Sequence, residues 1–582
     1  MTERNCKIVC TLGPASDDRE TIERLVEAGM SVARLNASHG TPEGRGRVID
    51  RVRRVDEPTA TPVATMVDVA GPEVRTAPID GTVDLDAGTE VELYVGDDAG
   101  GQRIGLSRSV AAVEPGDSVL LDDGRIRTRV TRVEGDSVYA EVLDGGELAG
   151  RKGVNTPGVD LGFDPITEAD RRELELAADK AVEFVAQSFV RSAEDVYAAS
   201  DILDSHGVEV PIVAKIELAE AVENLDGIID AAYGVMVARG DLGVECPLER
   251  VPVIQKRIIR RCHETGVPVI TATEMLDSMV HEGRPTRAEA SDVANAVLDG
   301  TDAVMLSAET AVGDHPVTVV ETMDRIVRDV ESSEEYDEAR EARVPPAEDT
   351  RTDALARSAR YLARDVDATA VVAASESGYT ARAAAQYRPA VPVVATTPDH
   401  RTRRQLSLSW GVIPRHAALP DDGVDELIID AVQTAIDTGV VEGGDTVVVI
   451  SGMMRDLEGT DASNTLKVHV AADVVARGRS VVAGQVAGPL HRIPDGDLTD
   501  LPDGAVVALP EWFDEEFHGD PTRIGAIVHE RLTMTGYPAV VAREVGIPMV
   551  SGTEVPADLD GEDVTVDGDR GVVYRGRLSD PR

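Results

Sequence analysis

Residues 234–245, GVMVARGDLGVE, combine the pattern of a buried strand with charged residues at its end. Val235 to Ala238 form an apolar run, and Arg239, Gly240 and Asp241 follow it directly. A run without polar alternation is typical of a parallel sheet that helices cover on both faces. The charged segment is either a polar turn or a place where a carboxylate is held at the end of the sheet. The rest of the chain decides between these two interpretations.

Seven similar runs occur in the first 330 residues, and a helical pattern such as DDRETIERLVEAG (17–29) follows each strand. The eight runs are CKIVCTL (6–12), MSVARLN (30–36), PVATMVDV (62–69), EFVAQSF (183–189), PIVAKIE (211–217), YGVMVARG (233–240), PVITATEM (268–275) and DAVMLSAE (302–309). Alternating strands and helices indicate an α/β fold with parallel strands and crossover helices. Eight units predict a closed (β/α)₈ barrel, with an open doubly wound sheet as the alternative.

The segment between the third and fourth runs has a different pattern. TVDLDAGTEVELYV (82–95), DSVLLDD (117–123) and DSVYAEV (136–142) alternate apolar and polar residues around Gly and Asp turns. This pattern predicts an antiparallel β-barrel domain inserted after a barrel strand. Loops after barrel strands form the active-site face, so the inserted domain is expected to act as a lid. We assign residues 1–70 and 157–335 to the catalytic barrel and 71–156 to the lid.

Two further domains are predicted after an acidic, proline-containing linker at 331–349. Residues 350–470 again alternate helix and strand patterns, as in ATAVVAAS (368–375) and VPVVATT (391–397), and predict a separate α/β domain. Residues 472–582 are rich in glycine and proline turns and form a fourth, swivelling-type β/α unit.

The composition is strongly acidic. The formal net charge is −48, and only six of the 58 basic residues are lysines. Such surfaces keep proteins soluble at high salt, where screening removes self-repulsion, so we expect a halophilic, cytoplasmic protein. A disordered acidic protein is the alternative, but periodic apolar segments disfavour it. The phosphate backbone of nucleic acid would be repelled, so nucleic acid is not expected as a partner.

Several classes of site and location are disfavoured by the sequence. The four cysteines, Cys6, Cys10, Cys246 and Cys262, have no C-x-x-C spacing, which disfavours a zinc site or a disulfide framework. No apolar run reaches about 18 residues and no signal peptide is evident, so no membrane association is expected. A P-loop motif is absent from the sequence.

Charged and polar residues stand at most of the predicted strand ends, where active sites of such barrels lie. They are Arg34, Asn36, Ser38, Asp68, Lys215, Glu217, Arg239, Asp241, Thr273, Glu274 and Glu309. A single one would often be a helix cap or a core hydrogen bond. So many charges at successive strand ends indicate a site, because burying each without a partner costs several kcal/mol.

The spacing of two carboxylates suggests a metal. Glu217 and Asp241 lie one βα unit apart and so fall at neighbouring strands, where they could hold Mg²⁺ or Mn²⁺. The alternative is that they form salt bridges with Lys215 and Arg239. Arg34 and Lys215 then suit a phosphate or carboxylate group.

These residues also carry a family resemblance. The motifs are KIVCTLGPAS (7–16), RLNASHG (34–40), GPEVRT (71–76), KGVNTPG (152–158), AKIE (214–217), MVARGDLGVE (236–245), TATEMLDSM (271–279) and RPTRAEASDVANAVLDG (284–300). Together they resemble pyruvate kinase, in a haloarchaeal-like form, over roughly residues 4–470. The resemblance implies transfer of phosphoryl from phosphoenolpyruvate to ADP to give pyruvate and ATP, the last step of glycolysis, by a homotetramer.

The same resemblance implies roles for individual residues. The substrate residues are Arg34, Lys215, Gly240, Asp241 and Thr273, of which Arg34, Lys215 and Thr273 are catalytic. The metal ligands are Glu217 and Asp241 for Mg²⁺ or Mn²⁺, and Asn36, Ser38, Asp68 and the carbonyl of Val69 for K⁺. The nucleotide contacts are Asn36, Ser38, His39 and Arg75. A phosphorylated effector is expected in the third domain at the SESGYT turn (375–380), through Ser375, Ser377, Gly378 and Thr380, with simple helix capping as the alternative.

The chain departs from the family pattern at a few positions. Val69 and Ala70 replace the usual Thr-Lys pair, and Ala169 stands where the family can carry a nucleotide-contacting lysine. Glu73 matches the acid of potassium-dependent members.

The fourth unit resembles the phosphohistidine domain of phosphoenolpyruvate-utilising enzymes through GQVAGP (484–489), PAVVAREVGIPMVSG (538–552) and VTVDGDRGVVYRG (564–576). Tyr537 occupies the place of the histidine, so we expect a degenerate domain that carries no phosphate. This argues against the rival function, a dikinase or synthase. A catalytically silent regulatory protein is the other rival, disfavoured by the set Lys215, Glu217, Asp241 and Thr273.

Overall fold

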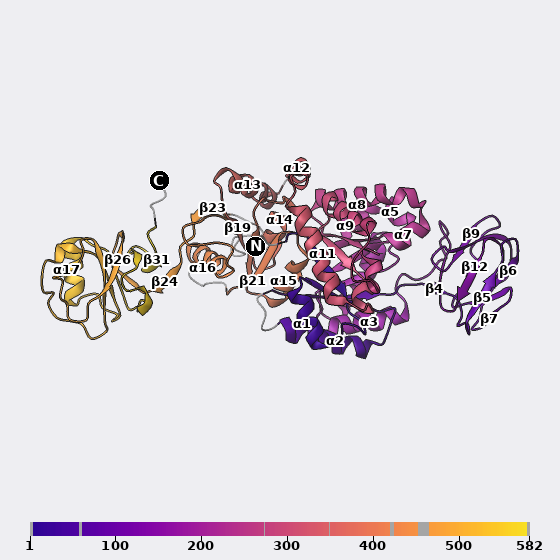
Figure 1. Cartoon of the computed structure of the whole chain (residues 1–582), viewed down its shortest axis with the longest axis horizontal. Helices are drawn as coiled ribbons and strands as arrows, with labels where there is room; N and C mark the ends of the chain where they lie inside the picture. The colour runs from indigo at the N-terminus through magenta and orange to yellow at the C-terminus, as the bar shows by residue number, and fades with distance from the viewer. Residues whose placement is uncertain are drawn as a thin grey trace. The chain divides into compact units, whose positions relative to one another are not determined.

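The computed structural model describes residues 4–56, 61–272, 274–347, 350–418, 424–451 and 465–578. The chain divides into two compact units. Figure 1 labels the helices and strands along the chain. The first comprises Met1–Thr350, Glu376–Arg388 and Asp399–His416, and the second comprises Arg351–Ser375, Pro389–Pro398 and Ala417–Arg582.

The core of the first unit is a closed barrel of eight parallel strands, in the order β1-β18-β17-β16-β15-β14-β3-β2. The strands are β1 (Lys7–Thr11), β2 (Val32–Asn36), β3 (Ala64–Val69), β14 (Phe184–Gln187), β15 (Ile212–Ile216), β16 (Gly234–Ala238), β17 (Val269–Ala272) and β18 (Ala303–Leu306). Each lies within one of the eight predicted runs. The predicted barrel is confirmed, and the alternative of an open sheet is wrong.

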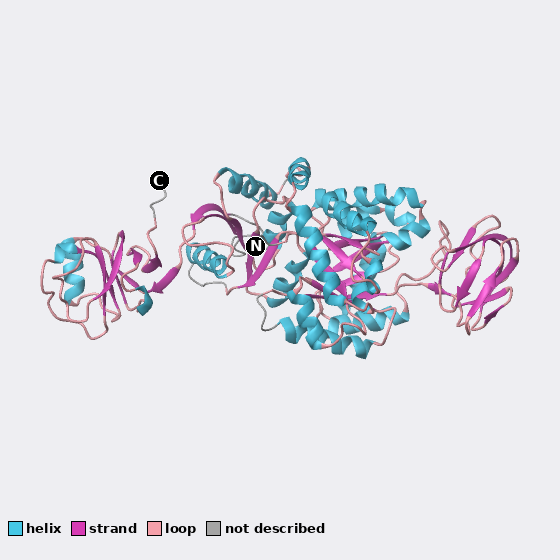
Figure 2. Cartoon of the chain, viewed as in Figure 1, coloured by secondary structure: helices cyan, strands magenta, loops and turns pink. Residues whose placement is uncertain are grey.

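Helices surround these strands, as Figure 2 shows. They are α1 (Arg19–Glu27), α2 (Pro42–Asp56), α3 (Glu168–Asp179), α4 (Ala193–Ser205), α5 (Ala219–Glu223), α6 (Leu225–Ala231), α7 (Arg239–Glu245), α8 (Val251–Thr265), α9 (Arg287–Asp299), α10 (Ala308–Ala311), α11 (Pro316–Glu331) and α12 (Glu334–Ala342). Local sequence sets several of their ends. Thr167 and Asp170 form a capping box at the start of α3, and Thr286 and Glu289 form one at α9. Gly300 ends α9 with φ 93°, a conformation that glycine adopts without steric cost.

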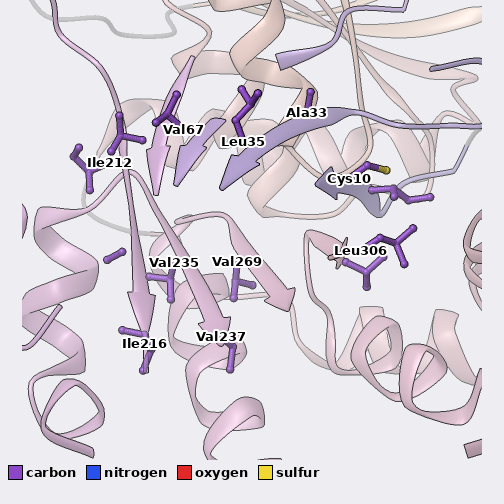
Figure 3. Packing of buried hydrophobic residues seen from close by; sticks show 14 of the residues in the cluster. Cys10, Ala33, Leu35, Val67, Ile212, Ile216, Val235, Val237, Val269 and Leu306 are labelled. Atoms are coloured by element: carbon purple, nitrogen blue, oxygen red, sulfur yellow. The ribbon is translucent and has the colours of Figure 1, made fainter. Parts of the chain in front are cut away.

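Alternate residues of the barrel strands pack into two separate cores. One set, which includes Met66, Val213 and Met236, forms a cluster inside the barrel. The neighbouring positions, such as Val67, Ile216 and Val235, pack with the surrounding helices (Figure 3). Because strand side chains alternate with period two, every barrel position has a predictable side.

The segment between β3 and β14 is built from strands, as predicted. They are β4 (Val74–Arg75), β5 (Thr82–Leu85), β6 (Glu90–Val95), β7 (Ala99–Gly100), β8 (Arg103–Leu106), β9 (Ser118–Leu121), β10 (Ile126–Glu134), β11 (Ser137–Asp144), β12 (Gly146–Ala149) and β13 (Gly153–Asn155). Eight of them form a sheet in the order β4-β13-β9-β10-β11-β6-β8-β7, which curls as a half-barrel with its own apolar core. Its pairs are antiparallel except for β6 and β8, which run parallel.

The first unit also includes α14 (Tyr379–Gln386), α15 (His400–Gln405) and β21 (Val412–His416). The second unit contains a parallel sheet, β20-β19-β22, which β23 extends in the antiparallel direction. Its elements are α13 (Arg351–Asp365), β19 (Ala370–Ala374), β20 (Val393–Thr397), α16 (Val424–Asp437), β22 (Thr446–Ser451) and β23 (Thr465–Val470).

The same unit ends in a further domain with an eight-stranded sheet, β24-β31-β30-β26-β27-β28-β29-β25. Its elements are β24 (Val474–Arg477), β25 (Arg479–Val482), β26 (Gln485–Arg492), β27 (Ala505–Leu509), β28 (Ile524–His529), α17 (Tyr537–Val545), β29 (Met549–Ser551), β30 (Asp563–Asp567) and β31 (Val572–Arg575). The predicted α/β domain and the additional β/α domain are therefore both present. In the part of the chain that the structure describes, no helix is long and apolar enough to cross a membrane.

Candidate active site

Three strands place charged side chains at one end of the barrel. Arg34 in β2, Asp68 in β3 and Lys215 in β15 have the same parity as the barrel-interior residues Val32, Met66 and Val213 of their strands. They therefore point into the mouth of the barrel at its carboxyl end, where the apolar interior stops. This placement makes them neighbours although the sequence separates them widely.

Asp68 is the centre of a buried ionic network. Its Oδ2 accepts a hydrogen bond from Arg34 Nε at 2.6 Å, and its Oδ1 lies 3.4 Å from Lys215 Nζ. Arg34 Nη1 donates to Thr11 Oγ1 at 2.9 Å. Burial by itself would raise the pKa of Asp68, but Arg34 and Lys215 outweigh it and hold the pKa below its usual value. Asp68 is therefore a carboxylate that keeps two cations in place.

Lys215 makes three polar contacts at the mouth of the barrel. Its Nζ lies 2.8 Å from Glu217 Oε1 and donates to Ser188 Oγ at 2.7 Å, in addition to the contact with Asp68. Burial would lower the pKa of Lys215, but the Asp68 and Glu217 carboxylates more than offset this and raise it. The side chain is therefore a permanent ammonium. Ser188 was not among the predicted site residues, although it is the polar end of the run EFVAQSF.

Glu217 follows β15 and is 2% exposed. Its Oε2 accepts a hydrogen bond from the backbone N–H of Phe189 at 2.7 Å. Burial, opposed by Lys215 and assisted by the charge of Asp241, raises the pKa of Glu217 to about 7. The carboxyl is held between two donors, and it is destabilised as an anion.

Asp241 lies in the first turn of α7, directly after β16, which pairs with β15. Burial raises its pKa, and the charges of Asp123 and Glu73 contribute in the same direction. Burial likewise raises the pKa of Glu73, with Glu217 and Asp123 contributing. Four carboxyl groups thus act on one another at this end of the barrel. Among the described residues, no group of three or more His, Cys, Asp or Glu side chains is already arranged as a metal cage.

The salt-bridge alternative is realised for only one of the two pairs that the sequence suggested. Lys215 does pair with Glu217. Arg239, by contrast, turns to the other side and pairs with Asp292 of α9 at 2.6 Å, while its Nε donates to the Ala272 carbonyl at 3.2 Å. Among the described residues, Arg239 therefore forms its salt bridge with Asp292 and not with Asp241.

The predicted potassium and nucleotide residues lie at the ends of β2 and β3 and in the lid. Asn36 is the register partner of Asp68, and Asn36 Oδ1 accepts from the backbone N–H of exposed Ser38 at 3.1 Å. His39 is exposed in the same loop. Arg75, in β4 of the lid, donates to Glu73 Oε2 at 2.8 Å. Asn36 therefore lies beside Asp68, and Ser38 and His39 follow Asn36 in the same loop. Arg75, in contrast, forms an ion pair within the lid.

The residue predicted to lie beside the enolate, Thr273, is outside the described residues. Its neighbour Glu274 has φ 44°, an uncommon conformation for a residue with a side chain. Glu309, which is 1% exposed, accepts from the backbone N–H groups of Leu276 at 3.1 Å and Ser307 at 2.6 Å. Glu309 thus accepts backbone hydrogen bonds from the loops that follow β17 and β18, which is a structural role and not a role in the site.

The predicted effector residues are divided between the two units. Ser375 ends the segment after β19 in the second unit and is buried. In the first unit, Gly378 precedes α14 with φ 78°, and Ser377 Oγ accepts from the backbone N–H of Tyr379 at 3.4 Å. Thr380 is buried in the first turn of α14. The N-cap of α14 is Gly378, which makes no side-chain capping bond, so the contact of Ser377 does not decide between helix capping and an effector site.

The fourth domain has no accessible histidine at the expected place. Tyr537 is the first residue of α17. His529 ends β28 and is 1% exposed, with its ring nitrogens 3.0 Å from the Arg531 carbonyl oxygen and 3.1 Å from the Phe513 carbonyl oxygen. Both nitrogens are therefore engaged by backbone groups.

Comparison with known proteins gives matches along the whole chain. The family descriptions "Pyruvate kinase, barrel domain", "Pyruvate kinase, alpha/beta domain" and "PEP-utilising enzyme, mobile domain" match residues 3–320, 353–469 and 501–571. A pyruvate kinase of Geobacillus stearothermophilus is 40% identical over 588 residues, which cover 99% of this chain and 100% of the relative. Pyruvate kinases of Bacillus licheniformis and Staphylococcus aureus are each 39% identical, over 99% and 98% of this chain and 100% and 99% of the relatives. The chain belongs to the pyruvate kinase family.

Proposed function

We propose that this phosphotransferase moves the phosphoryl group of phosphoenolpyruvate to ADP at the mouth of the barrel, between Arg34 and Lys215. The observation that carries this assignment is the buried chain Arg34–Asp68–Lys215–Glu217, which holds two permanent cations at the carboxyl ends of β2 and β15. A phosphoryl group in transfer spreads negative charge over its oxygens, so catalysis consists largely of positioned positive charge. Cations fixed by Asp68 need no reorganisation when the substrate arrives.

The division of labour follows from where each group is anchored. Arg34, tied to Asp68 and Thr11, presents a rigid planar donor set suited to phosphate oxygens. Lys215 supplies a point charge next to the reacting phosphoryl. Thr273 is proposed to help protonate the enolate, an assignment that rests on the family resemblance.

The residues present fit a divalent cation. Glu217 and Asp241 are hard oxygen donors at neighbouring strand ends, and burial raises the pKa of both. Repulsion from other carboxylates adds to this effect, from Asp241 on Glu217 and from Asp123 and Glu73 on Asp241. Because a bound cation would relieve that repulsion, the pair is suited to Mg²⁺ or Mn²⁺. Such an ion would neutralise phosphate charge when bound. The backbone of Gly240, beside Asp241, is proposed to border the substrate.

A monovalent cation is proposed between the ends of β2 and β3. Asn36 and Ser38 lie on one strand end, and Asp68 and the Val69 carbonyl lie on the other, with Asn36 and Asp68 in register. All four offer oxygen atoms, as a potassium ion requires. His39 and Arg75, with Asn36 and Ser38, are proposed to contact the nucleotide.

We infer further properties from composition and family. The net charge of −48 with six lysines supports a halophilic, cytoplasmic protein, and the family resemblance supports a homotetramer. The resemblance also supports a phosphorylated effector at Ser375, Ser377, Gly378 and Thr380.

A coupled assay for pyruvate with ADP, phosphoenolpyruvate and Mg²⁺ tests the proposal. We expect turnover in molar KCl, and a lower rate in NaCl of equal ionic strength, because both salts screen the acidic surface but only K⁺ suits the site at Asn36, Ser38 and Asp68. Circular dichroism in both salts controls for folding. Equal activation by the two salts would remove the potassium assignment, and absence of pyruvate in both would favour the catalytically silent rival.

The affinity for Mn²⁺ should depend on pH. A carboxyl whose pKa is raised to about 7 is protonated below that value and then cannot bind a metal. We therefore expect Mn²⁺ binding without substrate, followed by calorimetry, to weaken as the pH falls from about 8 to about 6. In Glu217→Gln this dependence should largely disappear. A wild-type affinity that is constant over the range would contradict the assignment of Glu217.

A further inference from the structure

Ser188 lies just beyond β14 among the charged groups of the barrel mouth. It is 4% exposed, and its Oγ lies 2.7 Å from Lys215 Nζ, 2.7 Å from the carbonyl oxygen of Val69 and 3.4 Å from Asp68 Oδ1. A buried hydroxyl with close partners on two other strands is a built contact and not an incidental one, because buried polar groups require partners.

The chemistry of the partners fixes the direction of these hydrogen bonds. A lysine ammonium only donates, and a backbone carbonyl only accepts. The Ser188 hydroxyl must therefore give its single proton to Val69 and receive a proton from Lys215. The result is a directed chain from Lys215 through Ser188 to Val69, which crosses from β15 over β14 to β3.

Ser188 differs from the other two partners of Lys215 because it is neutral. Glu217 and Asp68 are carboxylates, and incoming metal and phosphate charges act on them directly. The Ser188 hydroxyl is uncharged, so a metal cation bound by Glu217 would attract it only weakly. Its hydrogen bond with Lys215 Nζ therefore persists whether or not Glu217 binds a metal.

The turn that carries Ser188 is itself held firmly. Phe189 has φ 56°, and its backbone N–H donates to Glu217 Oε2 at 2.7 Å. Gly71, at the start of the lid, packs so closely here that a Cβ on it would lie 2.8 Å from the Phe189 ring and 3.3 Å from the Ser188 Cβ. A strained backbone that persists is over-determined by its surroundings. The same turn thus hydrogen-bonds to Lys215 through the Ser188 side chain and to Glu217 through the Phe189 backbone amide.

We propose that Ser188 is a positioning residue for phosphoryl transfer, whose hydroxyl anchors the Lys215 ammonium to the Val69 carbonyl. The inference rests on the proposed role of Lys215. Without the hydroxyl, the Asp68 and Glu217 carboxylates are the partners that Nζ keeps among the described residues, so it swings toward them, away from the phosphoryl position.

The test compares Ser188→Ala and Ser188→Cys with wild type. Cysteine keeps the approximate shape but hydrogen-bonds weakly, so it covers the case in which the alanine variant does not fold. We expect kcat to fall by about 10- to 100-fold in both, the range for partners that orient a reactive group, with little change in KM for phosphoenolpyruvate because Arg34 is intact. Ser407→Ala is the matched control. Ser407 is also 4% exposed and donates to a backbone carbonyl, that of Pro62, but Pro62 precedes β3, at the other end of the barrel.

Lysine labelling gives a readout that a merely structural role would not produce. Because the chain has only six lysines, modification of each by an amine reagent can be followed separately by mass spectrometry. Amine reagents attack the neutral amine, and in the Ser188 variants Nζ lies closer to the two carboxylates, which favour its ammonium form. We therefore expect Lys215 to label several-fold more slowly, while buried Lys7, whose Nζ donates to the Val412 carbonyl at 2.8 Å, keeps its wild-type rate. Faster labelling of both lysines would indicate general loosening and would overturn the proposal.

The outcomes separate this inference from the proposed function. Normal kcat and normal Lys215 labelling in both Ser188 variants, with an inactive Lys215→Met, would overturn the positioning role alone. Normal kcat in Lys215→Met would overturn the assigned site itself.

Discussion

Asp241→Asn and Glu217→Gln should each lower kcat by about 10² or more while the protein remains folded. Each change removes one ligand charge from a pair of carboxylates, and neither changes the size of the side chain. The fold should persist because burial already disfavours the charged form of both groups and raises their pKa values, so removal of the charge does not destabilise the folded protein. The measurement is kcat against Mg²⁺ concentration, with thermal unfolding of each variant as the check on folding.

A matched variant separates this effect from the loss of a charge as such. Glu249→Gln removes the same charge from an exposed position shortly after α7 and should leave kcat unchanged. Near-normal turnover of Asp241→Asn or Glu217→Gln at limiting Mg²⁺ would show that these carboxylates do not hold the metal.

Lys215→Met should reduce kcat by about 10² to 10³, the range for loss of a preorganised electrostatic group. Methionine fills much of the same volume but leaves Glu217 without its 2.8 Å cationic partner, so the pKa of Glu217 should rise further. The variant should therefore also bind Mn²⁺ with a pH dependence displaced upward. Steady-state kinetics and Mn²⁺ calorimetry at several pH values measure the two effects.

Lys256→Met is the control for Lys215→Met. Lys256 is 53% exposed in its side chain and pairs with Asp299 on the helical layer, so its replacement should not alter kcat. If the two lysine variants were equally active, the phosphoryl group would not be stabilised by Lys215.

The barrel and most of the ionic site could be predicted from the sequence because both depend on short-range periodicity. Apolar runs with helical patterns between them set the eight strands, and the alternation within β15 places Lys215 and Glu217 on one side. The contacts of Ser188 could not be predicted in this way. They join residues 119 and 27 positions apart, which the pairing of β14 with β3 and with β15 brings together.

Two other features were beyond sequence reasoning for the same reason. Arg239 is adjacent in sequence to the predicted metal residues, yet it pairs with Asp292, 53 positions away, because α9 presents a carboxylate there. In the lid, β6 pairs in parallel with β8, which alternation of apolar and polar residues cannot distinguish from antiparallel pairing. Pairing direction depends on the path of the connecting loop.

Because side chains alternate along a barrel strand, the number of residues before a position fixes whether its side chain faces the barrel mouth or the helices, much as a reading frame fixes a codon. Deleting one residue early in β15 would exchange the two sides of every later position, so that Ala214 and Ile216 would face the mouth and Lys215 would enter the apolar layer beneath the helices. One such slip would remove the reactive ammonium and bury a charge at once. Changes in length are tolerable only beyond the strand ends, where a loop restores the frame. The lid, residues 71–156, occupies such a place, so a whole domain can be inserted where a single residue inside β15 could not.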